Sequence, residues 1–170
     1  APPIILMLDL KNRPAAAYHQ LRQLCEQNAD MLCVYYPRKD STRRGAVQIL
    51  LSGGKPVEEL LADSVHYMAL DMGLGTVGDK RLHARIAPRV SSSYRGHFRW
   101  RGRGGKPMPA EQRAHLEDCI KKAHADGREL RFWAMPNRTI VWQTFYEAGV
   151  DWLNIDRLRK YRRWRVKSEK

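Results

Sequence analysis

The stretch LRFWAMPNRTIVWQTFYEAGVDWLN, residues 130–154, predicts a strand, a helix and a second strand in close succession. Residues 130–135 have the apolar density of a buried strand, and Asn137 or Thr139 can cap the helix that follows. A glycine then ends the helix, and residues 150–154 predict the next strand. Strands that alternate with helices over short connections indicate a parallel sheet covered by helices.

The same alternation extends along the rest of the chain. Further strands are predicted over residues 3–10, 31–36, 46–52, 67–71 and 89–92. Further helices are predicted over residues 15–27, 56–62 and 109–126, and from Asp156 onward. The polar stretch PRKDSTRRG, residues 37–45, predicts a hairpin or a long loop. Repeated β/α units predict an α/β fold, either an open sheet or a closed barrel.

Composition places the chain among globular proteins. Its 170 residues are 43% hydrophobic and 29% charged, which suits one domain of ordinary size. The longest apolar run, residues 2–8, is far shorter than a membrane span. Cys25, Cys33 and Cys119 form no CxxC pair, so we expect cysteines of the core and no disulfide scaffold or zinc knuckle. The start APPIILML shows no targeting signal.

Positive charge is concentrated in the second half of the chain. Residues 71–170 carry 23 Lys and Arg against 11 Asp and Glu, whereas residues 1–70 carry 8 against 7. Basic clusters lie in the glycine-rich segment 95–106 and in the tail 157–170. This distribution favours an anionic partner such as a phosphate, a nucleic acid or an anionic membrane surface, although solvated basic faces remain the alternative.

The motif LDLK places two charged side chains at the end of the first predicted strand. Asp9 and Lys11 are two residues apart, so they point to the same face at the carboxyl end. Active sites of α/β folds lie at that end. A carboxylate there can hold a divalent cation, and an ammonium group can neutralise a phosphoryl oxygen. A simple surface ion pair is the alternative interpretation.

An ordered set of segments then resembles a known family. The set is IILMLDLK (4–11), VQILLSGGKP (47–56), YMALD (67–71), FRWRGRGGKPMPAEQ (98–112), AHADGRELRFWAMPN (123–137) and AGVDWLNID (148–156). It resembles the bacterial phosphatidylinositol phospholipase C-like phosphodiesterases that are related to the altered inheritance of mitochondria proteins. More distantly, it is similar to the glycerophosphodiester phosphodiesterases and the sphingomyelinases D of spider venom.

The resemblance implies a fold and an activity. Residues 1–164 would form strands four to eight of a TIM-type barrel, followed by a basic tail at 165–170. The family cleaves phosphodiesters with Ca²⁺ or Mg²⁺, so Asp9 would match its metal ligand and Lys11 its catalytic, phosphate-contacting lysine. Trp133 and Asn154 would match residues near the headgroup pocket, and Asp156 the polar end of the last strand. The resemblance also favours a secreted or periplasmic location.

Other parts of the family pattern have no match in this chain. The family's upstream half supplies two histidines and a Glu-x-Asp metal pair, and Gly54 and Asn137 replace its usual asparagine and acid. We therefore expect an upstream segment or companion chain that completes the barrel, and we expect this chain to be unstable without it, since open sheet edges invite aggregation.

Two functions follow as expectations. The first is a metal-assisted phosphodiester hydrolase acting on a glycerophosphodiester or phospholipid headgroup. The second is a catalytically silent scaffold that binds RNA or another polyanion through residues 95–106 and 157–170. Tyr94, Phe98 and Trp100 alternate with arginines there, a pattern that can stack bases. The six histidines are expected in ordinary core or surface roles without partners.

Overall fold

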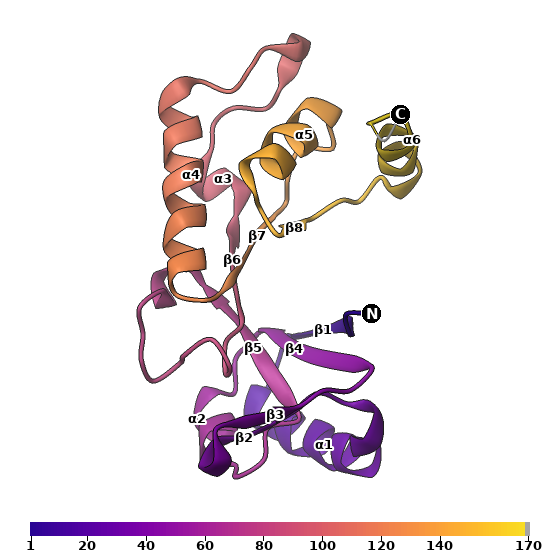
Figure 1. Ribbon diagram of the computed structural model, residues 1–170, viewed down its shortest axis with the longest axis vertical. Coiled ribbons are helices and arrows are strands. Elements are labelled where there is room, and N and C mark those ends of the chain that lie inside the picture. The colour runs from indigo at the N-terminus through magenta and orange to yellow at the C-terminus, as the bar shows by residue number, and fades with distance from the viewer. Residues whose placement is uncertain (169–170) are drawn as a thin grey trace. The chain divides into compact units, whose positions relative to one another are not determined.

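The computed structural model describes residues 1–168, and the chain divides into two compact units. Unit 1 comprises residues 1–72 and 81–88, and unit 2 comprises residues 73–80 and 89 onward. Both units are built from parallel strands and helices, as the sequence predicts, and each is described by itself (Figure 1). No helix of the described residues has both the length and the apolar character needed to cross a bilayer.

Unit 1 contains three parallel strands in the order β1-β4-β5. Its elements are β1 (Ile4–Leu10), α1 (Pro14–Gln27), β2 (Val34–Tyr36), β3 (Ser41–Arg43), β4 (Val47–Gly53), α2 (Val57–Ala62) and β5 (Met68–Gly73), with 3-10 turns at Ala29–Met31 and Pro37–Lys39. The register pairs Asp9 with Ser52, so the carboxyl ends of β1 and β4 lie together. Leu51, Leu60 and Leu70 are fully buried in the core between these strands and helices.

The predicted strand at residues 31–36 is correct only in its second half. Residues 29–31 form a 3-10 turn, and β2 pairs antiparallel with β3, which lies inside the polar stretch 37–45. That stretch therefore contains the hairpin, and β4 pairs with β1. All three residues of β3, Ser41, Thr42 and Arg43, are polar and exposed. The strand therefore has no apolar face by which its sequence could be recognised.

Unit 2 contains three further parallel strands in the order β6-β7-β8. Its elements are β6 (Arg89–Ser93), α3 (Tyr94–His97), α4 (Ala110–Ala125), β7 (Glu129–Trp133), α5 (Thr139–Ala148), β8 (Trp152–Leu153) and α6 (Leu158–Ser168), with 3-10 turns at Leu74–Thr76 and Arg103–Gly105. Helix α4 runs beside β6 and β7 in Figure 1. Of the basic tail at 165–170, residues 169–170 lie outside the described residues.

The aromatic residues of unit 2 form its core. Tyr94, Phe98, Phe132 and Phe145 contact one another with ring centroids 5.2 to 5.7 Å apart, mostly in tilted or edge-to-face arrangements. Trp100 is also buried. The expectation that aromatic residues of this segment stack bases is therefore wrong for Tyr94, Phe98 and Trp100, because burial in the core removes their faces from any ligand.

The strand count refines the predicted fold class. The resemblance implies five barrel strands, numbered four to eight, whereas six parallel strands lie within the described residues. In both units, successive parallel strands are neighbours and are joined by segments that contain helices, the connection that parallel pairing requires. The α/β class is confirmed, and the arrangement is consistent with part of a TIM-type barrel.

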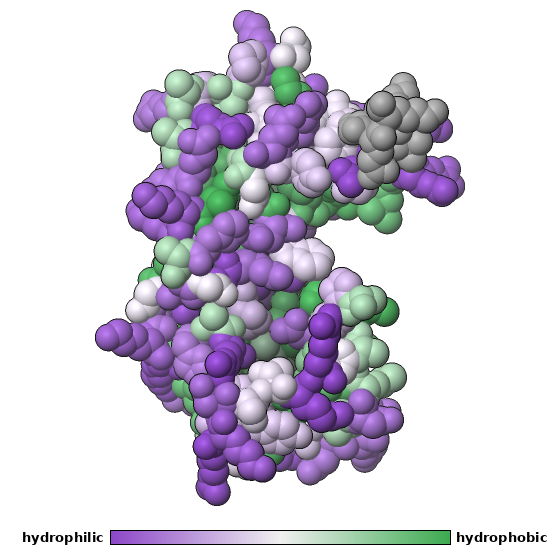
Figure 2. All heavy atoms as spheres, viewed as in Figure 1, coloured by the Kyte–Doolittle hydropathy of each residue, from purple (hydrophilic) through white to green (hydrophobic). Residues whose placement is uncertain are grey.

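Polar residues cover most of the surface seen in Figure 2.

Candidate functional site

The carboxyl end of β1 carries the predicted metal ligand and the predicted phosphate contact. Lys11 Nζ lies 2.5 Å from Asp9 Oδ2, and the two side chains are 75% and 51% exposed, respectively. The alternation along the strand thus brings the two groups together as the sequence predicts. An ion pair this exposed contributes little to stability, so its residues are available for a ligand.

A glycine loop at the end of β4 borders this pair. Gly53 has φ +75°, and a Cβ built there would lie 2.2 Å from Asp9 Oδ1 and 2.4 Å from the carbonyl oxygen of Leu10. The amide of Gly54 donates to that same carbonyl at 2.6 Å. Lys55 Nζ donates to the carbonyl of Gly53 at 3.0 Å, which brings a second cation to the loop. The segment SGGK is therefore part of the site that Asp9 and Lys11 begin.

The predicted headgroup residues belong to unit 2, so they are described apart from Asp9 and Lys11. Trp133 ends β7 and is 46% exposed, which leaves its indole available for a ligand. The side-chain oxygen of Asn154 accepts a hydrogen bond from the Arg131 guanidinium. That bond occupies the carbonyl end of the amide and leaves its NH₂ group as the end that can reach a ligand.

Asn137 and Asp156 have structural roles at the start of α6. Asn137 donates to Asp156 Oδ2 at 2.9 Å, and its own oxygen accepts from the backbone amides of Asp156 and Arg157 at 3.2 and 3.3 Å. Lys160 Nζ donates to the Asn137 carbonyl at 3.2 Å. These bonds join the loop after β7 to the segment that leads into α6. Asn137 thus has a structural role.

A cavity in unit 1 lies away from the Asp9 end of the strands. It has a volume of about 220 Å³ and opens among residues that include Tyr35, Gln48, His66, Met68 and Arg85. Gln48 and Met68 lie at the amino ends of β4 and β5. Residues at that end of an α/β barrel generally serve stability, and the Asp9–Lys11 pair does not contribute to the cavity.

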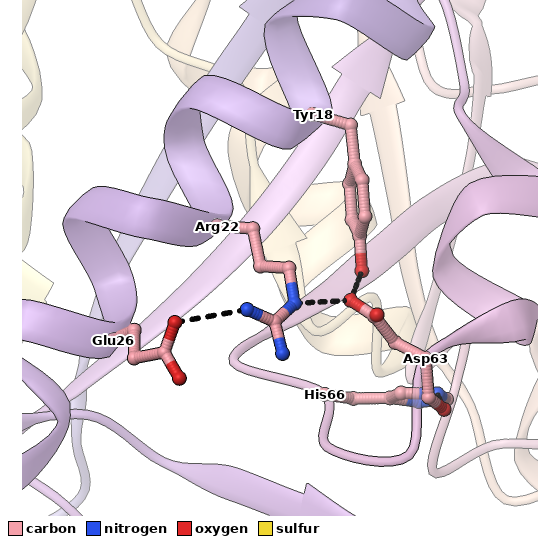
Figure 3. Close-up of polar contacts among 5 residues, drawn as sticks. All are labelled: Tyr18, Arg22, Glu26, Asp63 and His66. Atoms are coloured by element: carbon pink, nitrogen blue, oxygen red, sulfur yellow. Dashed lines mark hydrogen bonds and ion pairs between the residues drawn. The ribbon is translucent and has the colours of Figure 1, made fainter.

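A polar cluster of unit 1 fastens α1 to the segment after α2. Tyr18 Oη and Arg22 Nε both donate to Asp63 Oδ2, at 2.6 and 2.8 Å, and Figure 3 shows both groups pointing at that carboxylate. Burial, assisted by the Asp63 carboxylate, raises the pKa of Tyr18 above its usual range. Arg22 also pairs with Glu26 at 3.0 Å. The cluster orders the unit and offers no reactive group to a ligand.

The expectation that the histidines have no partners is wrong for several of them. His97 Nδ1 lies 3.1 Å from His115 Nε2, although 18 residues separate them in sequence. His124 Nε2 lies 2.9 Å from Asp151 Oδ2. Burial and the neighbouring His115 lower the pKa of His97, so its neutral form is favoured. Sequence reasoning missed the first pair because the loop between α3 and α4 determines the contact.

Cys119 lies in the same cluster, with its Sγ 3.8 Å from His115 Nε2. Cys25 and Cys119 are buried and all three cysteines are free, so the expectation of core cysteines holds for these two. Burial raises the pKa of the Cys119 thiol. The spacing of His115 and Cys119, four residues apart on one predicted helix, was the available sequence signal for their contact.

A comparison with known proteins finds a distant relative of this chain. The chain is 28% identical over 127 residues to a protein of Eremothecium gossypii named altered inheritance of mitochondria protein 6, with 66% of this chain and 33% of that protein aligned. The chain thus spans about a third of the length of this relative. No protein-family model matches the chain, and no solved structure matches it.

Proposed function

We propose that this chain supplies the charge-stabilising part of a metal-assisted phosphodiester hydrolase that acts on a glycerophosphodiester or phospholipid headgroup. One observation carries the proposal: Asp9 and Lys11 meet at the carboxyl end of β1, directly beside the SGGK loop that ends β4. Ligands of α/β folds bind at this end of the strands. The resemblance of the sequence to phospholipase C-like phosphodiesterases supports this class, and the Eremothecium relative carries the name of the altered inheritance of mitochondria proteins that this resemblance includes.

The residues at this end suit part of a hard-cation site. The Asp9 carboxylate offers at most two oxygen ligands, whereas Ca²⁺ takes about six to eight and Mg²⁺ takes about six. The remaining oxygens would come from water, substrate and an upstream or companion segment. The ion would supply Lewis acidity at the phosphoryl group. Lys11 would neutralise a phosphoryl oxygen as negative charge builds on it, and Lys55 stands close enough to the loop to add to that field.

In unit 2, taken by itself, Trp133 offers an exposed indole and Asn154 a side-chain NH₂ group, and both suit contacts with a headgroup. General acid and base groups would come from the upstream or companion segment, because the resemblance assigns the family's histidines to it. The chain would thus contribute electrostatic stabilisation and substrate binding.

Phosphodiesterase activity in the polypeptide with its upstream segment joined tests the proposal. Asp9→Asn and Lys11→Ala should each lower kcat by about 10², since each removes an electrostatic contact made in the transition state. Soluble glycerophosphoinositol and vesicles of phosphatidylinositol form separate arms that distinguish a free from a membrane-bound headgroup. Asp30→Asn and Lys39→Ala, which change exposed charges elsewhere in unit 1, are the matched controls. Full activity in both site variants would contradict the assignment.

A second candidate function is polyanion binding, favoured by the arrangement of α6. Trp142 of α5 contacts Tyr161 and Trp164 of α6, with centroids 5.8 and 6.2 Å apart. This aromatic face holds α6 on α5. Arg159, Arg162 and Arg163 remain exposed. A basic helix anchored through its aromatic side presents its cations to a phosphate backbone.

Affinity for single-stranded RNA as a function of salt tests this second function. Each phosphate contact should add about 0.7 to the slope of log affinity against log salt. Replacing Arg159, Arg162 and Arg163 together with glutamine should lower that slope by about 2. Arg38→Gln with Lys39→Gln, two cations of unit 1, should leave it unchanged. An affinity that does not vary with salt would remove this function.

A further inference from the structure

Three potential metal ligands converge in unit 2, and none of them belongs to the proposed phosphodiesterase site. His97 is the last residue of α3, while His115 and Cys119 lie one turn apart on α4. One ligand atom from each side chain lies within 4.8 Å of the other two. Residues four apart on a helix share a face, so α4 presents His115 and Cys119 to the end of α3 together.

The spacing of these atoms suits a tetrahedral ion. Zinc binds imidazole nitrogen at about 2.0 Å and thiolate sulfur at about 2.3 Å, which places two ligand nitrogens about 3.3 Å apart and nitrogen about 3.5 Å from sulfur. His97 Nδ1 and His115 Nε2 are 3.1 Å apart, and His115 Nε2 is 3.8 Å from Cys119 Sγ. Both separations are within a few tenths of an ångström of the zinc values, and the ligand atoms of His97 and Cys119 lie within 4.8 Å of each other.

Neighbouring groups hold His97 ready to bind. Ser92 Oγ lies 2.8 Å from His97 Nε2, so Nε2–H can donate to it and leave the Nδ1 lone pair facing His115. The His97 and His115 rings stack with 14° between their planes, and Phe132 packs edge-on against His97. Two ring nitrogens at 3.1 Å require a proton between them, and a metal ion can take the place of that proton.

The donor set identifies the metal class. Imidazole and thiolate favour borderline-soft transition metals, whereas Ca²⁺ and Mg²⁺ require oxygen ligands. We propose that His97, His115 and Cys119 bind one Zn²⁺ per chain and leave a fourth position open to water. On binding, the Cys119 thiol releases its proton to solvent as the Zn–S bond forms. The proton between the two rings moves through solvent from His115 Nε2 to His115 Nδ1, so that both imidazoles contribute neutral lone pairs. A site with three protein ligands and one open position has the composition of a catalytic zinc site.

Cobalt serves as the spectroscopic probe for this site in the full chain. After treatment with a chelator, the protein should bind one Co²⁺ with a thiolate-to-cobalt charge-transfer band, and added Zn²⁺ should abolish that band. Cys119→Ser should eliminate the band, whereas Cys33→Ser, which replaces a cysteine of unit 1, should retain it. Absence of the band in the unaltered protein, or its persistence in Cys119→Ser, would overturn the proposal.

Zinc affinity measured by calorimetry gives a second readout that does not depend on replacing a buried residue. His115 is exposed, so His115→Ala should fold and bind Zn²⁺ at least about tenfold more weakly. Ser92→Ala should weaken binding by about 10- to 100-fold, because it releases the ring that Ser92 orients. His19→Ala, an exposed histidine of α1, is the control and should bind as the unaltered chain does. Unchanged affinity in His115→Ala would exclude the site.

Discussion

At the scale of single residues, Gly53 links backbone geometry to the proposed phosphate site. Its φ of +75° lies in the left-handed region, and a Cβ there would meet both the Asp9 carboxylate and the Leu10 carbonyl. Only glycine avoids both the conformational cost and the collision. The position of Asp9 thus depends on a residue of another strand, which the pairing of β1 with β4 brings beside it.

Gly53→Ala should therefore destabilise unit 1 and displace Asp9. We expect a loss of at least about 1–2 kcal/mol from the left-handed conformation alone, with the collision adding to it. Urea unfolding measures the loss. Gly75→Ala is the matched control, because an added Cβ there meets nothing within 4 Å. Equal stability of Gly53→Ala and the unaltered chain would mean that the loop adopts another conformation.

His66 makes the stability of unit 1 depend on pH. Its side chain is 4% exposed, its Nε2 lies 3.1 Å from the Asp63 carbonyl, and its Nδ1 is buried without a hydrogen-bond partner among the described residues. Burial lowers the pKa of His66 and the nearby His83 lowers it further, against the raising effects of Asp63 and the Leu60 backbone. Protonation would place an unpaired N–H and a positive charge in the interior.

The unfolded chain therefore binds a proton at His66 more readily than the folded chain does. The free energy of unfolding should be unaffected by His66 above about pH 7.5 and should fall as pH drops through the ordinary histidine pKa of about 6.5 toward the folded value. His66→Gln keeps a donor for the Asp63 carbonyl and should flatten this part of the curve. His19→Gln should leave it as in the unaltered chain, and an identical pH dependence in His66→Gln would refute the account.

At the scale of elements, one shared carboxylate adds polar contacts to the apolar packing that holds α1 in unit 1. Asp63 follows α2 and accepts from both Tyr18 and Arg22 of α1 (Figure 3). Apolar contacts bury the rest of the Tyr18 ring, which is 1% exposed. The predicted helix at 15–27 is thus correct in position, and its face is set by a partner some 40 residues away.

Tyr18→Phe isolates the hydrogen bond in this cluster. The substitution keeps the ring and should cost about 1–2 kcal/mol of unfolding free energy, since the lost bond is to a charged acceptor that is partly exposed. Thermal and urea unfolding measure it. Tyr36→Phe, at another tyrosine of unit 1, controls for the loss of a phenol oxygen. Asp63→Ala should cost more than Tyr18→Phe, because it leaves two donors unpaired, and the reverse order would contradict this interpretation.

At the scale of the whole molecule, β1 and β8 are the outermost strands of the parallel sheet within the described residues. β1 has a strand neighbour on one side, β4, and its side chains Ile4 and Leu6 are 72% and 45% exposed. Leu8 and Leu10 of the same strand pack against the core. An apolar edge strand of this kind is a template for pairing with another chain. It is also where an upstream or companion segment would pair.

We expect the chain to self-associate through this edge, so replacing Ile4 and Leu6 together with lysine should weaken that association. Each removed apolar contact is worth about 1.5–3 kcal/mol, so the association constant should fall by about tenfold or more. Sedimentation velocity at several protein concentrations measures it. Leu158→Lys, at a 69% exposed leucine of α6, is the matched control. Association that is unchanged in the double variant and lost in the control would place the contact elsewhere.

The sequence by itself determined the α/β class, most of the strands and helices, and the meeting of Asp9 with Lys11. These features depend on periodicity over a few residues, which local sequence contains. The strands predicted from sequence are too long at their ends, as at residues 31–33 and 150–154. The end of a strand depends on how far its partner strand continues to pair with it.

Only the tertiary structure decided which distant residues meet. The contact of His97 with His115, the burial of Tyr94, Phe98 and Trp100, and the dependence of Asp9 on Gly53 all cross loops of many residues. Gly102, Gly104 and Gly105 each have positive φ in the loop that returns α4 toward α3. The path of such a loop is set by the packing at both of its ends, and no local pattern records it. The Asp9–Lys11 pair could be predicted because its two residues are neighbours along one strand. The cluster of His97, His115 and Cys119 could not be predicted, because its residues meet only in the folded chain.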